Sequence, residues 1–246
     1  MKGKMSEQVR RYVGEHPFLF FNIYRLRPRY RDLLVHQTTQ LVIEGFPRSG
    51  NTFAVVAFEQ AQHESVRIAH HLHMPAQVML AARWQIPTLV LIRRPKDAVL
   101  SLAIREPRIS ILQAMKHYVS FYEKAAGYRG AFVVGTFEEV IQDYGAVLKR
   151  VNAQFGTRFS LFDHWKDNVE GVFSQIEASH RARRDGRIDE KRIARPSAIK
   201  ARMKDPLRKE LQAPQIKELT TRAEAIYEDF VVASTEEEVP RSAMDA

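Results

Sequence analysis

The chain has 246 residues, which is enough for one large domain with a well-buried core and short for two domains of ordinary size. Hydrophobic residues make up 45% of it and charged residues 27%, so a disordered or fibrous protein is excluded. The formal charge of +9 favours an anionic partner, such as a nucleic acid, a membrane surface or a small polyanion. There is no cysteine, which excludes disulfides, thiolate metal sites and a thiol nucleophile.

The apolar runs of the sequence are short. The longest, such as residues 88–92, have the length of a strand and not of a membrane span. Residues 1–17 have neither the continuous apolar stretch nor the small-residue cleavage site of a secretory signal. We therefore expect a cytoplasmic protein.

The N-terminal part, residues 1–37, is predicted to form a helix and an irregular arm packed on the main domain. Its apolar side chains cluster ahead of a basic stretch; they are Phe18, Leu19, Phe20, Phe21, Ile23 and Tyr24. Such a cluster favours packing on the main domain, while aromatic residues flanked by arginines also suit contact with a membrane surface or an apolar acceptor. The main domain is expected to span residues 38–235, and residues 236–246 to form a disordered tail.

Strand and helix patterns alternate along the main domain. The pairs are 40–43 with 52–62, 88–92 with 95–104, and 131–134 with 137–155. This alternation predicts an α/β fold, in which a single domain has a central parallel sheet with helices on both faces and binds ligands at the carboxyl ends of its strands. Residues 163–192 are charged and weakly patterned, so we expect a lid or long loop there, before a helical segment at 196–230.

The segment GFPRSGNT, residues 45–52, lies between the first strand and its helix, where backbone N–H groups and a helix N-terminus bind anions. It has the spacing of a Walker A loop, but Asn51 stands in place of the lysine and Arg48 adds a cation inside the loop. Magnesium-dependent NTPases carry an aspartate at the end of a neighbouring strand, whereas the strand at 88–92 is followed by Arg93 and Arg94. These residues predict a phosphate site that uses arginines and needs no metal.

Two segments together resemble a known family, the PAPS-dependent sulfotransferases (PAPS is 3′-phosphoadenosine 5′-phosphosulfate). Residues 47–53, PRSGNTF, are similar to the phosphosulfate loop PKSGTTW of that family. Residues 93–101, RRPKDAVLS, match its second motif, R-x-P-K-D-x-x-x-S. The resemblance implies the P-loop NTPase-like architecture of sulfotransferases, with PAPS as donor, its desulfated form PAP as product, and no metal.

The resemblance also implies a role for each matching residue. The 5′-phosphosulfate would be bound by Arg48, Ser49, Gly50, Asn51 and Thr52, and the 3′-phosphate by Arg93 and Ser101. Phe53 and Phe137 fall near aromatic positions that contact the adenine, with core packing as the alternative for both. The basic segment Arg195–Lys200 stands where the family closes a glycine-containing segment over the 3′-phosphate, or else it belongs to a solvated charged helix.

The family uses a histidine ahead of the 3′-phosphate arginine as the general base, and His71 is the best match by its spacing to Arg93. His70 and His73 are the alternatives. A metal site is disfavoured because no HExxH spacing is present and acidic ligands are scarce nearby. The family's lysine two residues before the histidine is replaced by Ala69, so we expect Arg48 to take part in catalysis by stabilising charge on the leaving phosphate.

These observations predict a sulfotransferase that moves a sulfonate from PAPS to a hydroxyl group, or less readily an amine, by in-line transfer. The acceptor stays open among small molecules, lipids and carbohydrates, as does the oligomeric state. Three alternatives remain: a non-catalytic nucleotide- or polyanion-binding P-loop protein; a P-loop kinase or NTPase, which the arginines after the strand at 88–92 disfavour; and a nucleic-acid binder.

Overall fold

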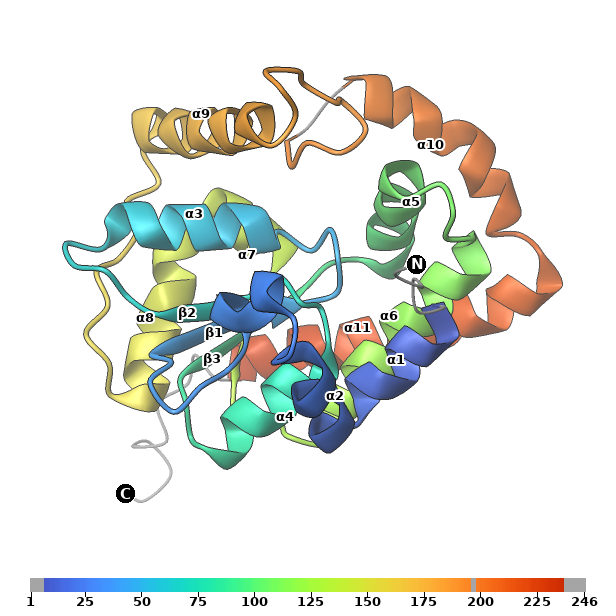
Figure 1. The fold of residues 1–246 in the computed structure, drawn as a ribbon. Helices are drawn as coiled ribbons and strands as arrows, with labels where there is room; N and C mark the ends of the chain where they lie inside the picture. Colours follow the sequence, from blue (N-terminus) through green and yellow to red (C-terminus); the bar gives the residue numbers. More distant parts are fainter. Residues whose placement is uncertain (1–6, 196–197, 237–246) are drawn as a thin grey trace.

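The computed structural model describes residues 7–195 and 198–236 and shows one α/β domain. At its centre lies a parallel four-stranded sheet with the order β2-β1-β3-β4 (Figure 1). The strands are β1 (Leu41–Gly45), β2 (Ile68–His70), β3 (Thr88–Ile92) and β4 (Val133–Thr136). The predicted fold class, a parallel sheet covered by helices on both faces, is confirmed.

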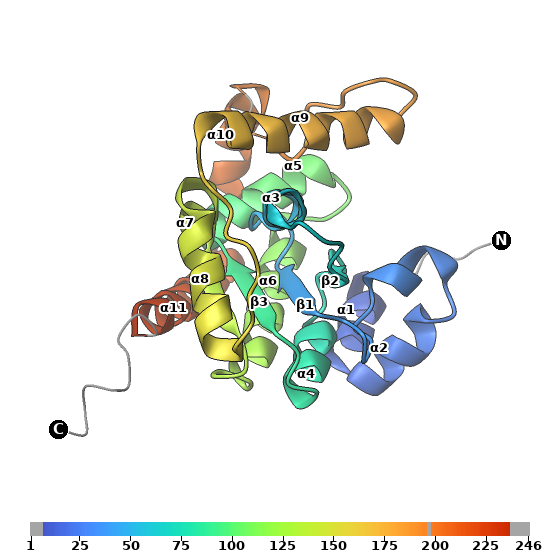
Figure 2. The same cartoon turned by 90° about the vertical axis from the view of Figure 1, so that its left-hand side faces the viewer.

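Side chains alternate between the two faces of the sheet, as the period of two residues requires. Leu41 and Ile43 point to one face, which is covered by α3 (Asn51–Ala61), α8 (Tyr144–Phe155) and α9 (Lys166–Ala182). Val90 and Ile92 point to the other face, which is covered by α5 (Pro95–Arg105), α6 (Ile111–Ala126) and α11 (Pro214–Glu236). Figure 2 shows the strands with α3 above them and α4 (Pro75–Arg83) below them. Because both faces are buried, the strands read as continuous apolar runs.

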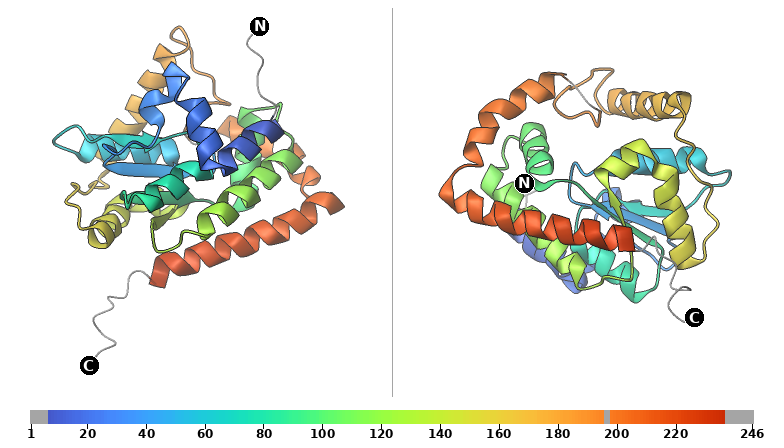
Figure 3. Two further views of the ribbon diagram at one scale, coloured as in Figure 1. Left: turned by 60° about the horizontal axis from the view of Figure 1, so that its bottom comes forward. Right: turned by 180° about the vertical axis from the view of Figure 1, so that it is seen from behind.

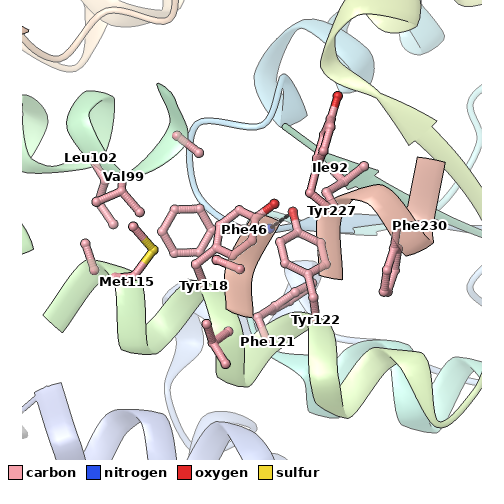
Figure 4. Close-up of a cluster of buried hydrophobic side chains, with 14 of the residues drawn as sticks. Phe46, Ile92, Val99, Leu102, Met115, Tyr118, Phe121, Tyr122, Tyr227 and Phe230 are labelled. Atoms are coloured by element: carbon pink, nitrogen blue, oxygen red, sulfur yellow. Dashed lines mark hydrogen bonds between the residues drawn. The ribbon is translucent and has the colours of Figure 1, made fainter. Parts of the chain in front are cut away.

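A cluster of aromatic residues fixes the loop after β1 to the helices beneath it (Figure 4). The hydroxyl of Tyr122, on α6, donates a hydrogen bond of 2.7 Å to the carbonyl of Leu91 and accepts one of 3.2 Å from the backbone N–H of Phe46. Phe230, on α11, packs against the Tyr122 ring with 5.3 Å between the ring centroids. Figure 3 shows α11 running alongside α6. The loop after β1 therefore begins on a buried support.

The N-terminal part differs from the single helix and irregular arm predicted for it. It forms two α-helices and a 3₁₀-helix: α1 (Glu7–Glu15), α2 (Pro17–Tyr24) and η1 (Pro28–Leu33). The break between the α-helices falls at His16, which is extended, because Pro17 cannot continue a helix but suits the first position of the next. Phe20 and Tyr24 pack with Leu72 and Met74, which lie ahead of α4 (Pro75–Arg83).

The prediction of a lid or loop at 163–192 is wrong for its first half, where α9 is a regular helix. Val169, Val172, Phe173 and Ile176 recur at helical spacing and form the apolar side that packs with α3 on the sheet. The charged residues on the other side of α9 masked this pattern. Residues 183–195 do contain an irregular stretch.

Two further boundaries differ from the sequence expectation. The helix predicted at 137–155 is divided into α7 (Phe137–Gln142) and α8, because Asp143 leaves the helical conformation and its side chain caps α8 by accepting from Ala146 N. The third predicted strand is displaced toward the C-terminus, as β4. The sequence analysis had assigned no element to the stretches that form β2, α4 and α6.

The C-terminal helical segment consists of α10 (Ala198–Glu210) and α11, which a short turn separates. Residues 196–197, 1–6 and 237–246 lie outside the described part of the chain, so the expectations for Pro196, Ser197 and the tail are untested. Within the described residues, no helix is both long enough and apolar enough to cross a membrane.

Candidate functional site

The candidate site forms where β1 and β3, the two central strands, end side by side. Gly45 is paired with Leu91 in the parallel register, so the next residues of both strands emerge at the same edge. From there the chain returns from β1 to β2 on one side of the sheet, while β4 lies on the other side, beyond β3. Such a reversal of direction opens a crevice at the carboxyl ends of the strands, where α/β proteins bind ligands.

The loop after β1 has the conformation of an anion cradle. Arg48 and Gly50 both have positive φ values, of 76° and 95°, which turn successive backbone N–H groups inward. Gly50 adopts this left-handed conformation without the strain that a Cβ atom causes. The loop leads into α3, whose first turn receives no side-chain cap among the described residues. The N–H groups of that turn are therefore available to an anion.

Residues of the two sequence motifs meet at this loop. Nε of Arg48 donates a hydrogen bond of 2.9 Å to Oγ of Ser101, on α5. Arg93, just after β3, donates from Nη1 to the carbonyl of Arg48 at 3.2 Å. The guanidinium of Arg93 also lies 3.8 Å from the centroid of the Phe137 ring. The loop, both arginines and Ser101 thus form one connected group.

The arginines of this group are close together and poorly compensated. Burial is the main cause that lowers the pKa of Arg48 to about 10, and the charges of Arg105 and Arg93 act in the same direction. Burial likewise lowers the pKa of Arg93 and of Arg105. All three stay protonated at neutral pH, as arginine side chains do in proteins. Their mutual repulsion is relieved when an anion binds, so the site attracts phosphate or sulfate groups.

A cavity of about 630 Å³ opens above the loop. Eight arginine and lysine side chains line it, against one acidic side chain, that of Asp205. Its walls come from the start of α3, from α5 and α7, from α9 and from α10, which Figure 1 shows around the carboxyl edge of the sheet. Lys204, on α10, pairs with Asp97, on α5, at 2.8 Å and holds α10 over the cavity.

Most of the site residues predicted from the sequence border this cavity. They are Arg48, Gly50, Asn51, Thr52, Phe53, His71, Arg93, Ser101, Phe137 and Arg195. Ser49 does not border it, because its side chain is fully buried and its Oγ lies 3.4 Å from the Tyr122 hydroxyl. Asn51 borders it but turns its amide back to the Phe46 carbonyl, to which Nδ2 donates at 3.1 Å. Ser49 can therefore contribute its backbone N–H, and Asn51 closes the loop on itself.

The two predicted aromatic contacts have different surroundings. Phe53 is buried against Phe162 and Phe173, with ring centroids 6.1 and 5.6 Å away, so it belongs to the core as well as to the cavity wall. Phe137 is partly exposed, and the guanidinium of Arg93 lies over its ring.

Arg195 is at the cavity but carries little free charge. Its guanidinium pairs with Glu177 at 3.1 Å and with Glu190 at 2.8 Å. Lys200 is buried and donates to the carbonyl of Ile193 at 2.8 Å. Burial, followed by the charge of Arg48, lowers the pKa of Lys200 to about 8. The described part of the segment Arg195–Lys200 thus folds on itself beside the cavity.

The turn between β2 and α4 brings two imidazoles, those of His71 and His73, to the cavity. Nε2 of His71 lies 3.1 Å from Oγ1 of Thr52, at the start of α3, and the Nδ1 atoms of His71 and His70 face each other. His73 donates from Nδ1 to the carbonyl of Gly45 at 2.8 Å. A carbonyl can only accept, so this bond fixes the proton of His73 on Nδ1 and leaves Nε2 as a proton acceptor.

A buried carboxyl group holds this turn in place. Glu44 is fully buried at the end of β1, and its two oxygens accept hydrogen bonds of 2.9 Å from the backbone N–H groups of Leu72 and His73. His71 and His73 both have positive φ values, of 62° and 55°, which non-glycine residues adopt at a cost in energy. The bonds to Glu44 offset that cost and set the direction of the imidazoles.

Burial is the main cause of the pKa shifts of the three histidines and of Glu44. It lowers the pKa of His73 to about 3 and of His70 to about 4, and it lowers the pKa of His71 well below its ordinary value. Burial raises the pKa of Glu44 to about 8, although its hydrogen bonds oppose the increase. At neutral pH the imidazoles are therefore neutral, and each has one nitrogen with a free lone pair.

Arg105 and Glu44 contribute to the site but were not predicted from the sequence, and the same holds for Arg202, Lys204 and Arg208 on α10. Arg105 lies one helical turn beyond Ser101 on α5, and this spacing of four residues could have indicated it. Glu44 could have been noticed as a lone acid inside the apolar run of β1. No group of three or more His, Cys, Asp or Glu side chains suited to a metal ion is found within residues 7–195 and 198–236.

The chain is similar to a solved structure of a known protein. No family model matches the chain, and no curated protein matches it. Among solved structures, the chain is similar to a mouse sulfotransferase, SULT7A1, complexed with PAP. The two chains are 14% identical, the match covers 78% of this chain and 91% of the other, and the TM-score is 0.40. The residues of the cavity, and not this likeness, carry the proposal that follows.

Proposed function

We propose that this protein is a PAPS-dependent sulfotransferase, which moves a sulfonate group from PAPS to a hydroxyl group of an acceptor. One observation carries the proposal: residues of both sulfotransferase-like motifs meet at the ends of β1 and β3 and border one cationic cavity that also contains neutral imidazoles. A phosphate loop alone would support any nucleotide. Arg93 and the neutral imidazoles favour a sulfotransferase over other nucleotide-binding proteins.

The cavity suits the donor in size and charge. Its volume lies within the range of about 300–1,000 Å³ that is usual for small-molecule sites. In the proposed arrangement, the loop N–H groups, Arg48 and Thr52 hold the phosphosulfate, and Arg93 and Ser101 hold the 3′-phosphate. Phe137 borders the space left for the base. When bound, PAPS would supply the sulfonate and leave as PAP.

The proton of the acceptor hydroxyl would go to an imidazole of the turn between β2 and α4. His71, the residue expected from spacing, and His73 both border the cavity. The tautomer of His73 favours it, because Nε2 has a lone pair directed by the bond from Nδ1 to Gly45. His71 supports the loop through Thr52. We therefore propose that His73 is the base and that His71 supports the loop beside the phosphosulfate.

Cations of the cavity would stabilise the negative charge that develops during the transfer. Negative charge develops on the leaving phosphate oxygen, beside Arg48 and the N-terminus of α3, and fixed donors stabilise it without reorganisation. A hydroxyl acceptor is preferred over an amine because an amine is protonated at neutral pH. Its positive charge is repelled by the arginines and lysines of the cavity.

Binding of PAP in the absence of Mg²⁺ tests this proposal directly. We expect PAP at about a hundredfold excess over its dissociation constant to raise the free energy of unfolding by roughly 2.7 kcal/mol. Adenosine 5′-monophosphate, which lacks the 3′-phosphate, is the matched control and should bind more weakly. The absence of any PAP effect would disprove the proposal, and tight binding of Mg-ATP with hydrolysis would favour a kinase or NTPase.

PAP binding without catalysis would leave the alternative of a non-catalytic nucleotide-binding protein. Turnover separates the two: radiolabelled PAPS is incubated with a panel of alcohols, phenols, sugars and lipids. Transfer of the label to a hydroxyl compound is the expected result. No transfer to any member, and no PAP formed, would favour the non-catalytic alternative.

A further inference from the structure

Helix α2, with the sequence PFLFFNIY, is apolar on nearly every side, yet it is covered on one side only. Phe20 and Tyr24 are buried, at 0% and 3% exposure, against the turn ahead of α4. On the solvent side, the Phe18 side chain is 80% exposed. Helices that are apolar all round are normally buried on all sides. The solvent side of α2 therefore lacks a partner within the described residues.

The exposed apolar side chains continue beyond the helix. The Leu19 side chain is 36% exposed and the Leu26 side chain 77%. Phe18 lies in the first turn of α2, and Leu26 lies in the turn that follows the helix. Of the eleven exposed large hydrophobic residues in the described chain, five fall between Val9 and Leu26. This concentration exceeds the scatter of single apolar residues that is ordinary for a protein surface.

Four exposed arginines follow the exposed apolar residues: Arg25, Arg27, Arg29 and Arg31. Arg25 bonds within its own helix, to Asn22, while Arg27 and Arg29 lie over tyrosine rings, at 5.6 Å from Tyr24 and 4.4 Å from Tyr30. None of the four forms an ion pair with an acid in the described structure. The segment 17–34 contains one acid, Asp32. Its charge is therefore strongly positive and uncompensated.

This N-terminal surface, made of Phe18, Leu19, Leu26 and the four arginines, is distinct from the candidate site. Figure 2 shows α1 and α2 as a lobe on one side of the molecule, beside α4, whereas α9 and α10 lie across another side. None of its residues lines the cavity. Binding of donor or acceptor therefore does not cover it.

We propose that the N-terminal surface binds the surface of an anionic lipid bilayer, with Phe18 and Leu26 inserted among the lipids. Exposed apolar side chains next to arginines match the boundary of a membrane, where acyl chains adjoin phosphate groups. A second copy of this chain fits less well, because a symmetric contact would bring two sets of four unpaired arginines together. The inference is independent of the proposed function.

Flotation with lipid vesicles tests this inference on the full-length protein. Vesicles of phosphatidylcholine are compared with vesicles that also contain phosphatidylglycerol. We expect binding to the second kind only, weakened by salt because the arginines contribute. The double variant Phe18→Ser/Leu26→Ser should reduce binding by about tenfold or more. It should fold normally, because both side chains are exposed in the protein alone.

The control is Trp165→Ser, which removes an aromatic side chain of 70% exposure just ahead of α9 and should leave binding unchanged. A second variant, Arg27→Gln/Arg29→Gln, should weaken binding and reduce its dependence on salt. Unchanged binding of the Phe18→Ser/Leu26→Ser variant would overturn the proposal, since the net charge of the chain would then explain it. Absence of binding to anionic vesicles would overturn it too.

Discussion

Arg48 and Ser101 are joined by a hydrogen bond of 2.9 Å from Nε to Oγ, although 53 positions separate them in the chain. Arg48 belongs to the loop after β1 and Ser101 to the helix after β3. The bond therefore connects the two motifs before any ligand is bound. It holds a buried guanidinium in place, so the energy needed to order that side chain is not taken from ligand binding.

Replacement of Arg93 by alanine should weaken PAP binding by about tenfold to a hundredfold, which is the usual worth of a hydrogen bond to a charged group. The side chain is partly buried at the cavity and bonds to the loop carbonyl of Arg48. Isothermal titration calorimetry measures the change.

Arg94→Ala is the matched control for Arg93, since Arg94 is the adjacent residue, is exposed and lies over Tyr227 instead of lining the cavity. Its PAP affinity should stay close to that of the unchanged protein. Equal losses in the two variants would mean that overall charge, and not a specific phosphate contact, governs binding.

Replacement of His73 by alanine should reduce turnover by about a hundredfold to ten-thousandfold, the usual contribution of a general base, and leave PAP affinity nearly unchanged. His71→Ala should reduce turnover less and weaken PAP binding slightly, because His71 contacts Thr52 of the loop. Transfer of label from PAPS and PAP titration measure the two effects separately.

His63→Ala serves as the control for the histidine variants, because His63 is exposed in the connection between α3 and β2. It should retain full turnover. If His71→Ala lost all turnover while His73→Ala kept it, the assignment of the base would return to His71, as spacing in the sequence indicated.

Replacement of Glu44 by glutamine should change how stability depends on pH. The pKa of Glu44 is raised from 4.5 to about 8, so the folded protein binds a proton more tightly than the unfolded chain. The resulting stabilisation is fully present below pH 4.5 and is lost as the pH rises to about 8. Relative to the glutamine variant, the unchanged protein should therefore lose stability across this interval.

Urea unfolding at a series of pH values measures this difference. The buried histidines have the opposite effect, because they lower the free energy of unfolding as the pH falls below 6.5. Both proteins contain these histidines, so their effect cancels in the comparison. A constant difference between pH 4.5 and 8 would contradict the prediction. The variant should also turn over PAPS more slowly, because the Glu44 bonds direct His73.

Much of the fold was determined by local patterns in the sequence. Apolar runs at β1 and β3 predicted strands, since a strand buried on both faces needs continuous apolar residues. The hydrophobic pattern did not predict α9, because charged residues hide the apolar side that α3 covers. It also did not predict the end of α7 at Asp143, where a side-chain cap begins a new helix. Both depend on contacts or caps that a periodic pattern does not contain.

Some features of the candidate site were likewise predictable from the sequence, and others were not. Local patterns place Arg48 and Arg93 just after strands of a parallel sheet and Ser101 on the helix after β3, so the sequence predicts that they meet at one edge. The directions of individual side chains depend on the folded structure. It turns Ser49 toward Tyr122, pairs Arg195 with two glutamates, and fixes the tautomer of His73 through a carbonyl of β1. The physical reason is that each of these outcomes depends on a partner distant in the chain, and a linear motif does not specify that partner.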